Sequence, residues 1–472
     1  MYLDSNSENN PVEKVALFEA MLKGKTLTFF DADDFELIIE YYFNVNFKAK
    51  AVKALELGLE QYPNDLSLLL IKVDLLNGHQ KFNKSLEILS KLNKFYPGNI
   101  DVLFSLGKLY SITESFKEAV LKFNKVYELI CLDSSQEDLL QDLAYELMQI
   151  GENNTAITVL KHLLRLHPND ETSMMELGVA FHEAGKFKEA VAYFESIIDN
   201  TPYNHLAWFN LATIYNIEED WKEAIFGYEM CLVINEKFTA AHYGKANSYI
   251  QTKEYQKAIE SFNESFIYDQ PHAYAYCSIG ECYEKIGDYS KSLMFYEKSL
   301  EIDDSLPESW LGIGVVRDLN NQPEQAIKFM KKALELDHEN SESWYIYAEL
   351  LTKLNRKEEA DSAFKKVIEL DPVNIDAWID YSNFLFDNTS KLKALNLVEK
   401  SIEINKNNFD LKLRLVAMQI SIGLISEAKL NLIEMQGNNP KTFNKLLDIY
   451  PELLENKSIN EFFALYNDSS QK

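Results

Sequence analysis

Glycine, proline and cysteine are scarce in this chain of 472 residues, with 16, 11 and 4 residues respectively. Glycine has about half its usual share of roughly 7%. Together with 46% hydrophobic and 26% charged residues, this argues against a loop-rich all-β protein and against disorder. The four cysteines include no CxxC pair, so we expect reduced thiols and a cytoplasmic protein.

Long apolar runs and basic charge are also lacking. No eighteen consecutive apolar residues occur, so we predict no membrane insertion. The first thirty residues begin acidic and contain no apolar stretch of signal-peptide length, so we expect no export signal. Lys and Arg total 47 against 74 Asp and Glu, a net charge of −27. This charge repels phosphate backbones, which disfavours direct nucleic-acid binding, and it attracts basic partners.

A small residue returns every 34 positions through most of the chain. It is alanine in ten places, and Ser85 and Ser292 fill the two gaps. The alanines are Ala51, Ala119, Ala156, Ala190, Ala224, Ala258, Ala326, Ala360, Ala394 and Ala428. Twelve units run through residues 32–442, with a three-residue insertion at 134–136. Residues 1–31 and 443–472 remain as the two ends.

Each unit contains two stretches with apolar residues three and four positions apart, which predicts two helices. A second small residue keeps the 34-residue step from Gly107 to Ser382 in nine units. Small residues on both helices allow the helices to cross closely without overpacking. Seven units carry Gly or Asn between the helices, where a left-handed residue ends the first helix. They are Asn46, Gly151, Gly185, Gly287, Asn321, Asn355 and Gly423.

The combined pattern is W-x2-L-[GA]-x2-Y, then A-x3-F, then P. One unit shows most of it in Trp208, Leu211, Ala212, Tyr215, Ala224 and Tyr228. This pattern resembles the tetratricopeptide repeat (TPR) family, over about seven-eighths of the chain. The resemblance implies an all-α fold, a right-handed α-solenoid superhelix of about twelve helix–turn–helix repeats. First helices would line a concave groove, and second helices would form the convex back.

The two ends are predicted to cap this solenoid. Residues 1–31 form a tail and a short helix that opens at Asn10 and Pro11. Residues 443–472 form capping helices and a frayed tail. Ser458 and Glu461 make an S-x-x-E capping box before an apolar stretch at 462–466.

The sequence predicts no enzyme. The 31 residues before the repeats and the 30 after them are too few for a catalytic domain. The chain contains no GxxxxGK[ST], GxSxG or HExxH motif. The acidic run from Asp31 to Glu36 lacks the glycine and the final glutamate of a calcium-binding loop. We therefore predict no catalytic residue, no cofactor and no metal site.

The resemblance implies ligand contact through the second, fifth, ninth, twelfth and thirteenth positions of each first helix. These 60 positions hold 16 carboxylates and three lysines. In the eighth to tenth units the acids include Glu281, Glu284, Asp318 and Glu349. Seven of the 16 acids occupy the second position, where compensation of the helix dipole explains them. The others form either a binding site for basic segments or a solvated acidic surface.

The sixth and seventh units differ because their groove positions carry no charge. Amide groups can bond both N–H and C=O of an extended peptide, and aromatic rings supply rigid contact area. Ile217 and Ile250 lie in the same run, and they either join this surface or pack between units. The candidate contact residues are Phe209, Asn210, Thr213, Asn216, Tyr243, Asn247 and Gln251.

The sequence thus favours a non-catalytic protein-interaction scaffold that binds a partner segment with basic residues in the groove. The alternative is a self-assembling structural or adaptor protein that uses solenoid faces or terminal helices. We expect a monomer or a weak homo-oligomer. Arg317 stands where Tyr or Leu usually packs, so it either pairs with a neighbouring acid or marks loosening of the stack. Trp344 is predicted to be a core residue whose loss costs roughly 3–5 kcal/mol.

Overall fold

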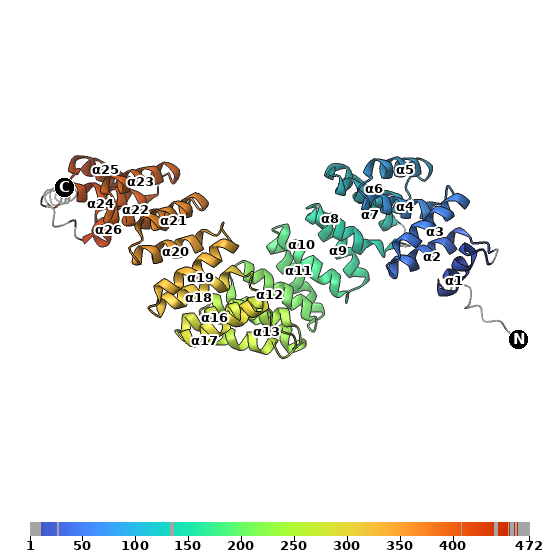
Figure 1. Cartoon of the computed structure of the whole chain (residues 1–472), viewed down its shortest axis with the longest axis horizontal. Coiled ribbons are helices and arrows are strands. Elements are labelled where there is room, and N and C mark those ends of the chain that lie inside the picture. Colours follow the sequence, from blue (N-terminus) through green and yellow to red (C-terminus); the bar gives the residue numbers. More distant parts are fainter. Residues whose placement is uncertain are drawn as a thin grey trace. The chain divides into compact units, whose positions relative to one another are not determined.

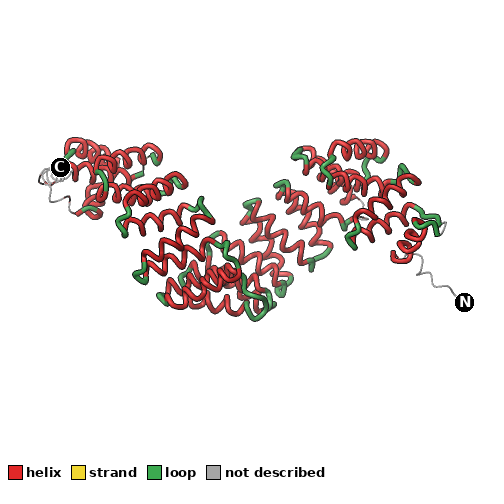
Figure 2. Tube along the Cα trace, viewed as in Figure 1, coloured by secondary structure: helices red, strands yellow, loops and turns green. Residues whose placement is uncertain are grey.

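The computed structural model describes residues 11–25, 28–132, 136–406, 408–438 and 442–451, together with Leu453, Lys457 and Asn460. Within this part of the chain there are 26 helices and no strand (Figures 1 and 2). The predicted all-α solenoid is confirmed. The helices group into two compact units, Met1–Asn235 and Glu236–Lys472.

The first unit contains thirteen of these helices. They are α1 (Pro11–Leu22), α2 (Ala32–Asn44), α3 (Lys48–Gln61), α4 (Leu66–Gly78), α5 (Phe82–Phe95), α6 (Ile100–Ile112), α7 (Phe116–Leu132), α8 (Leu139–Gln149), α9 (Asn153–Leu166), α10 (Glu171–Glu183), α11 (Phe187–Asn200), α12 (His205–Ile217) and α13 (Trp221–Ile234).

The second unit contains the other thirteen. They are α14 (Thr239–Gln251), α15 (Tyr255–Ser265), α16 (Ala273–Ile286), α17 (Tyr289–Ile302), α18 (Pro307–Leu319), α19 (Pro323–Leu336), α20 (Ser341–Lys353), α21 (Lys357–Leu370), α22 (Ile375–Asn388), α23 (Lys391–Ile404), α24 (Phe409–Ile422), α25 (Ile425–Asn438) and α26 (Thr442–Ile449).

Helices α2 to α25 form twelve consecutive pairs, and the first helices follow the 34-residue step. Helix α2 begins at Ala32 and α24 at Phe409, the first residues of their sequence units. Helix α8 begins at Leu139, just after the insertion, of which Ser134 and Ser135 lie outside the described residues. The tail before Pro11, the predicted capping box of Ser458 and Glu461, and the apolar stretch 462–466 also lie outside them.

The first helices begin with a recurring side-chain cap. Asn99, for example, accepts a hydrogen bond from the backbone N–H of Val102 at 2.9 Å. Such a cap satisfies one of the N–H groups that the first turn leaves without a helical partner. The residues that cap first helices through an Asp or Asn side chain are Asp31, Asp65, Asn99, Asp170, Asn204, Asn340, Asn374 and Asn408.

In eleven of the twelve pairs the turn between the two helices uses one left-handed residue. All seven predicted Gly and Asn positions have positive φ, from Asn355 at 56° to Gly423 at 90°. The same position has positive φ in four further pairs, where the residue is neither Gly nor Asn: Gln80, Glu114, Glu219 and Lys253. The eleventh pair differs because β-branched Thr389 has a φ of −130° and Ser390 caps the next helix instead.

The helix crossings are as close as the small residues predict. All twelve repeated Ala and Ser positions on the second helices are 0% exposed. Ser292 Oγ donates a hydrogen bond to the carbonyl of Gly280 at 2.8 Å, so this position faces the backbone of the first helix. At Gly107 an added Cβ would lie 2.4 Å from the ring of Phe123. A larger side chain at these points would force the helices apart.

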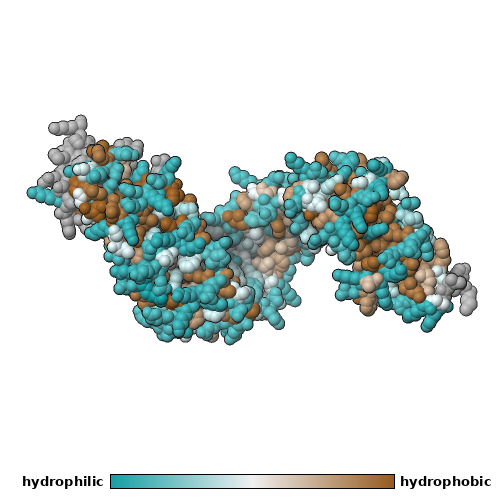
Figure 3. Space-filling model, turned by 45° about the horizontal axis from the view of Figure 1, so that its top comes forward, coloured by the Kyte–Doolittle hydropathy of each residue, from teal (hydrophilic) through white to brown (hydrophobic). Residues whose placement is uncertain are grey.

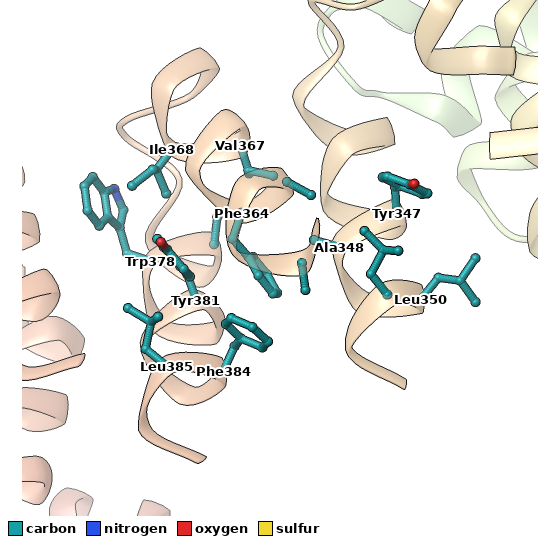
Figure 4. Packing of buried hydrophobic residues seen from close by; sticks show 14 of the residues in the cluster. Tyr347, Ala348, Leu350, Phe364, Val367, Ile368, Trp378, Tyr381, Phe384 and Leu385 are labelled. Atoms are coloured by element: carbon teal, nitrogen blue, oxygen red, sulfur yellow. The ribbon is translucent and has the colours of Figure 1, made fainter. Parts of the chain in front are cut away.

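Buried apolar side chains fill the space between neighbouring helices. In the second unit the rings of Phe364 and Tyr381 stack with centroids 5.4 Å apart, and Trp378 lies beside Ile368 (Figure 4). Polar side chains cover most of the visible surface, and apolar ones form separate patches (Figure 3).

Trp344 is not the core residue that the sequence predicted. It is partly buried and packs at the edge of this cluster, while its indole N–H donates to the carbonyl of His338 at 3.0 Å. Trp378 occupies the core position instead, with 1% of its surface exposed. The two tryptophans share a repeat position, so the packing of each repeat decides which ring is covered.

Candidate partner-binding surface

First helices of neighbouring repeats contact one another, as α2 contacts α4 and α16 contacts α18. Their outward side chains therefore share one face within each compact unit. The candidate contact residues all lie on first helices, and Asn210 is the one that is fully buried. The uncharged run is divided between the units, because α12 belongs to the first and α14 to the second.

On α12 the structure leaves three candidates partly accessible. The ring of Phe209 lies 5.8 Å from that of Tyr228. Thr213 Oγ1 donates to the carbonyl of Phe209 at 2.9 Å. Asn216 is half-buried near the end of the helix, as is Ile217. These side chains combine apolar area with polar groups.

Asn210 is a correction to the sequence analysis, because it is 4% exposed. Its Nδ2 donates to the carbonyl of Met174 on α10 at 2.8 Å. A Cβ on Gly178 would lie 2.3 Å from the Asn210 side-chain oxygen, so the missing side chain makes room for the amide. Asn210 therefore joins two repeats inside the protein and is not part of the accessible face.

On α14 the accessibility increases along the helix. The ring of Tyr243 packs against His272 and Phe262, with centroids 4.7 and 5.9 Å away. Its hydroxyl is buried without a hydrogen-bond partner among the described residues. Asn247 and Ile250 are half-buried, and Gln251 is exposed.

The acidic candidates separate into two groups. Glu281 and Glu284 on α16 lie at one pocket of about 220 Å³ with Glu308 of α18 and Glu342 of α20. Asp318 lies elsewhere and is paired with Lys353 at 2.7 Å. We call the pocket that the four glutamates line the acidic pocket.

Glu349 also lies outside this pocket. It is exposed on α20, near Asp380 of the following repeat. Partial loss of hydration raises the pKa of Glu349, and the negative charge of Asp380 raises it further. Two of the four predicted acids are thus brought together, and two are not.

Sequence reasoning missed Glu308 and Glu342, because both stand at the second position of their helices and were explained by the helix dipole. The available signal was their repeat spacing. An acid at the second position of successive first helices comes next to the acids of the preceding helix. The same carboxylates therefore offset the helix dipole and line the pocket.

The acidic pocket has an apolar wall and few basic groups. Leu311, Val315 and Ile346 line it, and Lys285 is its one lysine. Lys285 Nζ lies 3.4 Å from the Glu284 carboxylate, which also accepts a hydrogen bond from the Tyr296 hydroxyl at 3.1 Å. Four glutamates against one lysine leave the pocket negative.

Burial is the main cause of a raised pKa at Glu281; Lys285 lowers this pKa, and the nearby Glu284 and Glu342 raise it. Burial also raises the pKa of the Cys277 thiol to about 12, so this pocket residue is a neutral thiol at neutral pH. The pocket thus holds carboxylate charge at a free-energy cost, which a bound cation would reduce.

Glu281→Gln is expected to stabilise the chain at about pH 7. The folded-state pKa is raised above the ordinary value of 4.5. The stability contribution of this carboxyl is therefore complete below the unfolded pKa and is lost as pH rises through the folded pKa. Melting temperatures at about pH 7 and about pH 4 should show a gain that vanishes in acid. The exposed Glu297→Gln on α17 is the control; an equal gain at both pH values would contradict the argument.

The sequence left open whether Arg317 pairs with an acid or marks a loosening of the stack, and among the described residues its side chain bonds an amide. Arg317 is half-buried at the end of α18, and its Nη1 donates to the side-chain oxygen of Gln322 at 3.0 Å. Its Nε is buried without a hydrogen-bond partner in the described part of the chain. The partner is thus an amide across the turn and not an acid.

The described residues also bear on disulfides, membrane-spanning helices and metal sites. The four cysteines are free, and Cys131 is the exposed one. None of the described helices combines the length and the apolar character needed to span a bilayer. Among the described residues, no group of three or more His, Cys, Asp or Glu is placed to hold a metal ion.

Three family models match parts of the chain. Two tetratricopeptide repeat models match residues 142–205 and 239–267. The model of anaphase-promoting complex, cyclosome, subunit 3 matches residues 287–367. No curated protein sequence matches the chain.

Several solved structures are similar at low identity. The APC/C hetero-tetramer Cut9-Hcn1 is 14% identical, with 85% of this chain and 92% of that chain covered and a TM-score of 0.43. A tetratricopeptide repeat protein from Parabacteroides merdae is 18% identical, with coverages of 54% and 99% and a TM-score of 0.42. YrrB, a TPR protein with an unusual peptide-binding site, is 17% identical, with coverages of 39% and 95% and a TM-score of 0.31.

Proposed function

This chain is a tetratricopeptide-repeat protein, and we propose that it is a cytoplasmic scaffold that binds a basic segment of a partner protein on its first helices. Repeats of this family are generally non-catalytic and bind proteins. The segment carries an Arg or Lys into the acidic pocket of the second unit. Binding positions the partner, and no chemical step is involved.

The observation that carries the proposal is the acidic pocket itself. Glu281, Glu308 and Glu342 come from three different repeats and line one pocket. Helices packed in fixed register hold these carboxylates close together in spite of their repulsion. A bound guanidinium or ammonium group would relieve this repulsion.

The apolar wall adds selectivity for a long basic side chain. Arg and Lys have aliphatic stems that pack on apolar surface while their charged ends reach polar groups. Leu311, Val315 and Ile346 provide such a surface beside the carboxylates. Arg is the better fit where several acceptors converge, because its planar group presents five N–H donors.

The match of residues 287–367 to an anaphase-promoting complex subunit model supports a role within a multi-protein assembly. These residues include Glu308 and Glu342 of the acidic pocket. The same region would then serve both as a repeat stack and as a contact surface.

A random peptide library panned against the whole chain tests the proposal. Enriched peptides should contain Arg or Lys, and Glu281→Lys with Glu342→Lys should weaken the binding of those that have no bulky apolar residue beside the base at least about tenfold. Reversal places two lysines beside the incoming base, which replaces attraction with repulsion. Fluorescence anisotropy with an enriched peptide measures the affinities.

The matched control reverses two exposed acids on a second helix, Glu297→Lys with Glu301→Lys on α17. It changes the net charge equally, and binding should stay within about twofold of the original. Equal loss in both variants, or no bias toward basic residues, would refute the pocket. Sedimentation velocity addresses the alternative, because mass that grows with concentration indicates self-assembly.

A further inference from the structure

The first unit has a second pocket on its first helices, between α2 and α4, that the sequence analysis did not single out. Its volume is about 640 Å³. This lies within the usual range for pockets that bind ligands, roughly 300–1,000 Å³. We call it the N-terminal pocket.

Apolar side chains make up much of its lining. Ile39 is 1% exposed and belongs to the core below, while Ile71 and Leu75 are half-buried and line the pocket from α4. Covering these side chains by a partner would remove apolar surface from water, at about 25 cal/mol per Å². The favoured occupant therefore has a large apolar side chain.

Acids surround this apolar surface. Glu36 and Glu40 project from α2, and Asp74 projects from α4. One lysine, Lys48, lines the same pocket. Burial raises the pKa of Glu36 and of Asp74, so both carboxylates lose hydration that a cation would replace. The charge of the lining is complementary to a basic group.

We propose that the N-terminal pocket binds a partner segment in which a bulky apolar residue is followed by basic residues. The inference rests on the proposed scaffold function, but it assigns a separate binding site in the other compact unit. The apolar residue enters between Ile71 and Leu75, and the basic residues lie against Glu40 and Asp74. The smaller acidic pocket of the second unit accepts a basic side chain alone.

The test uses a short fluorescein-labelled Gly/Ser peptide with a Trp-Arg-Arg core and the whole chain. The comparison peptides carry Ser-Arg-Arg or Trp-Ser-Ser at the same place. Anisotropy should show the Trp-Arg-Arg peptide binding at least about tenfold more tightly than either. If the Ser-Arg-Arg peptide bound as tightly as the Trp-Arg-Arg peptide, no apolar anchor would be needed. If the Trp-Ser-Ser peptide bound as tightly, the charge of the pocket would not contribute to binding.

Two exposed substitutions locate the binding. Glu40→Lys reverses a charge at the rim, and Gly78→Phe fills the pocket from a position where an added Cβ meets nothing within 4 Å. Each should weaken the Trp-Arg-Arg peptide at least about tenfold. Glu118→Lys on α7, also exposed, is the matched control and should change affinity by less than about twofold. Unchanged binding in both pocket variants would overturn the proposal.

The same peptide separates this inference from the proposed function. A chain with Glu281→Lys and Glu342→Lys should still bind it with unchanged affinity. Loss in that variant alone would place the peptide in the acidic pocket and overturn the N-terminal site. Concentration-dependent mass that Gly78→Phe abolishes would show that a second copy of the chain occupies the pocket, which also overturns the proposal.

Discussion

Trp378→Ala is expected to destabilise the chain by about 3–5 kcal/mol, because a large buried side chain would be replaced by a cavity. Trp378 is 1% exposed and lies in the core of the second unit beside Ile368 (Figure 4). Its indole N–H donates to the carbonyl of Pro372 at 2.9 Å. The substitution therefore removes apolar contacts and one of the two hydrogen bonds that this carbonyl accepts, the other coming from Asn405 Nδ2 at 3.0 Å.

Urea denaturation followed by circular dichroism measures this loss. Trp344→Ala is the matched control, since it removes the same side chain from the same repeat position one repeat earlier. Trp344 is only partly buried, so its loss should cost clearly less than that of Trp378. If Trp344→Ala lowered the free energy of unfolding more than Trp378→Ala, Trp344 and not Trp378 would be the buried core residue.

Gly312→Ala is expected to destabilise the chain by roughly 1–3 kcal/mol through overpacking. An added Cβ would lie 2.2 Å from the ring carbon that carries the Tyr296 hydroxyl. On the α16 side the ring already lies close to Gly280, where an added Cβ would be 2.8 Å from it, so there is little room in that direction. Tyr296 is also 2% exposed, so the acidic pocket that it lines is the space left for its ring to move into.

The same change should alter the acidic pocket, since Tyr296 donates to Glu284 there. Denaturation midpoints of purified variants measure the stability effect. Gly78→Ala is the control of opposite sign. Its added Cβ meets nothing within 4 Å, so alanine should stabilise the helix by up to about 0.5–1 kcal/mol. An unchanged midpoint for Gly312→Ala would show that the Tyr296 ring is not confined.

The repeat architecture was predictable from sequence because spacing constrains packing directly. Ala360 and Ser292 stand at one repeated position, and both are fully buried at helix crossings. The left-handed turns were predictable only in the units where the turn residue is Gly or Asn. Glu219 and Lys253 adopt positive φ in the same turn, at a cost of roughly 1–2 kcal/mol, because the packed helices on both sides impose it.

The candidate surface was less predictable. The position of a residue in its helix indicates which way the side chain points, but it does not indicate whether the side chain is buried. Asn210 faces the preceding repeat, and the absence of a side chain at Gly178 allows it to be buried. Asp318 faces outward but is neutralised by Lys353 from the next repeat. Both outcomes depend on the identity of a neighbour in another repeat, which position within a single helix does not reveal.

The most direct test of the central claim is a photo-crosslinking map of a basic peptide on the intact chain. An enriched peptide from the library carries a photoreactive group next to its Arg or Lys, and mass spectrometry locates the crosslinked residues. If the segment lies in the acidic pocket, crosslinks are expected on α16, α18 and α20 around Glu281 and Glu342. Crosslinks confined to the second helices α17 and α19 would contradict it.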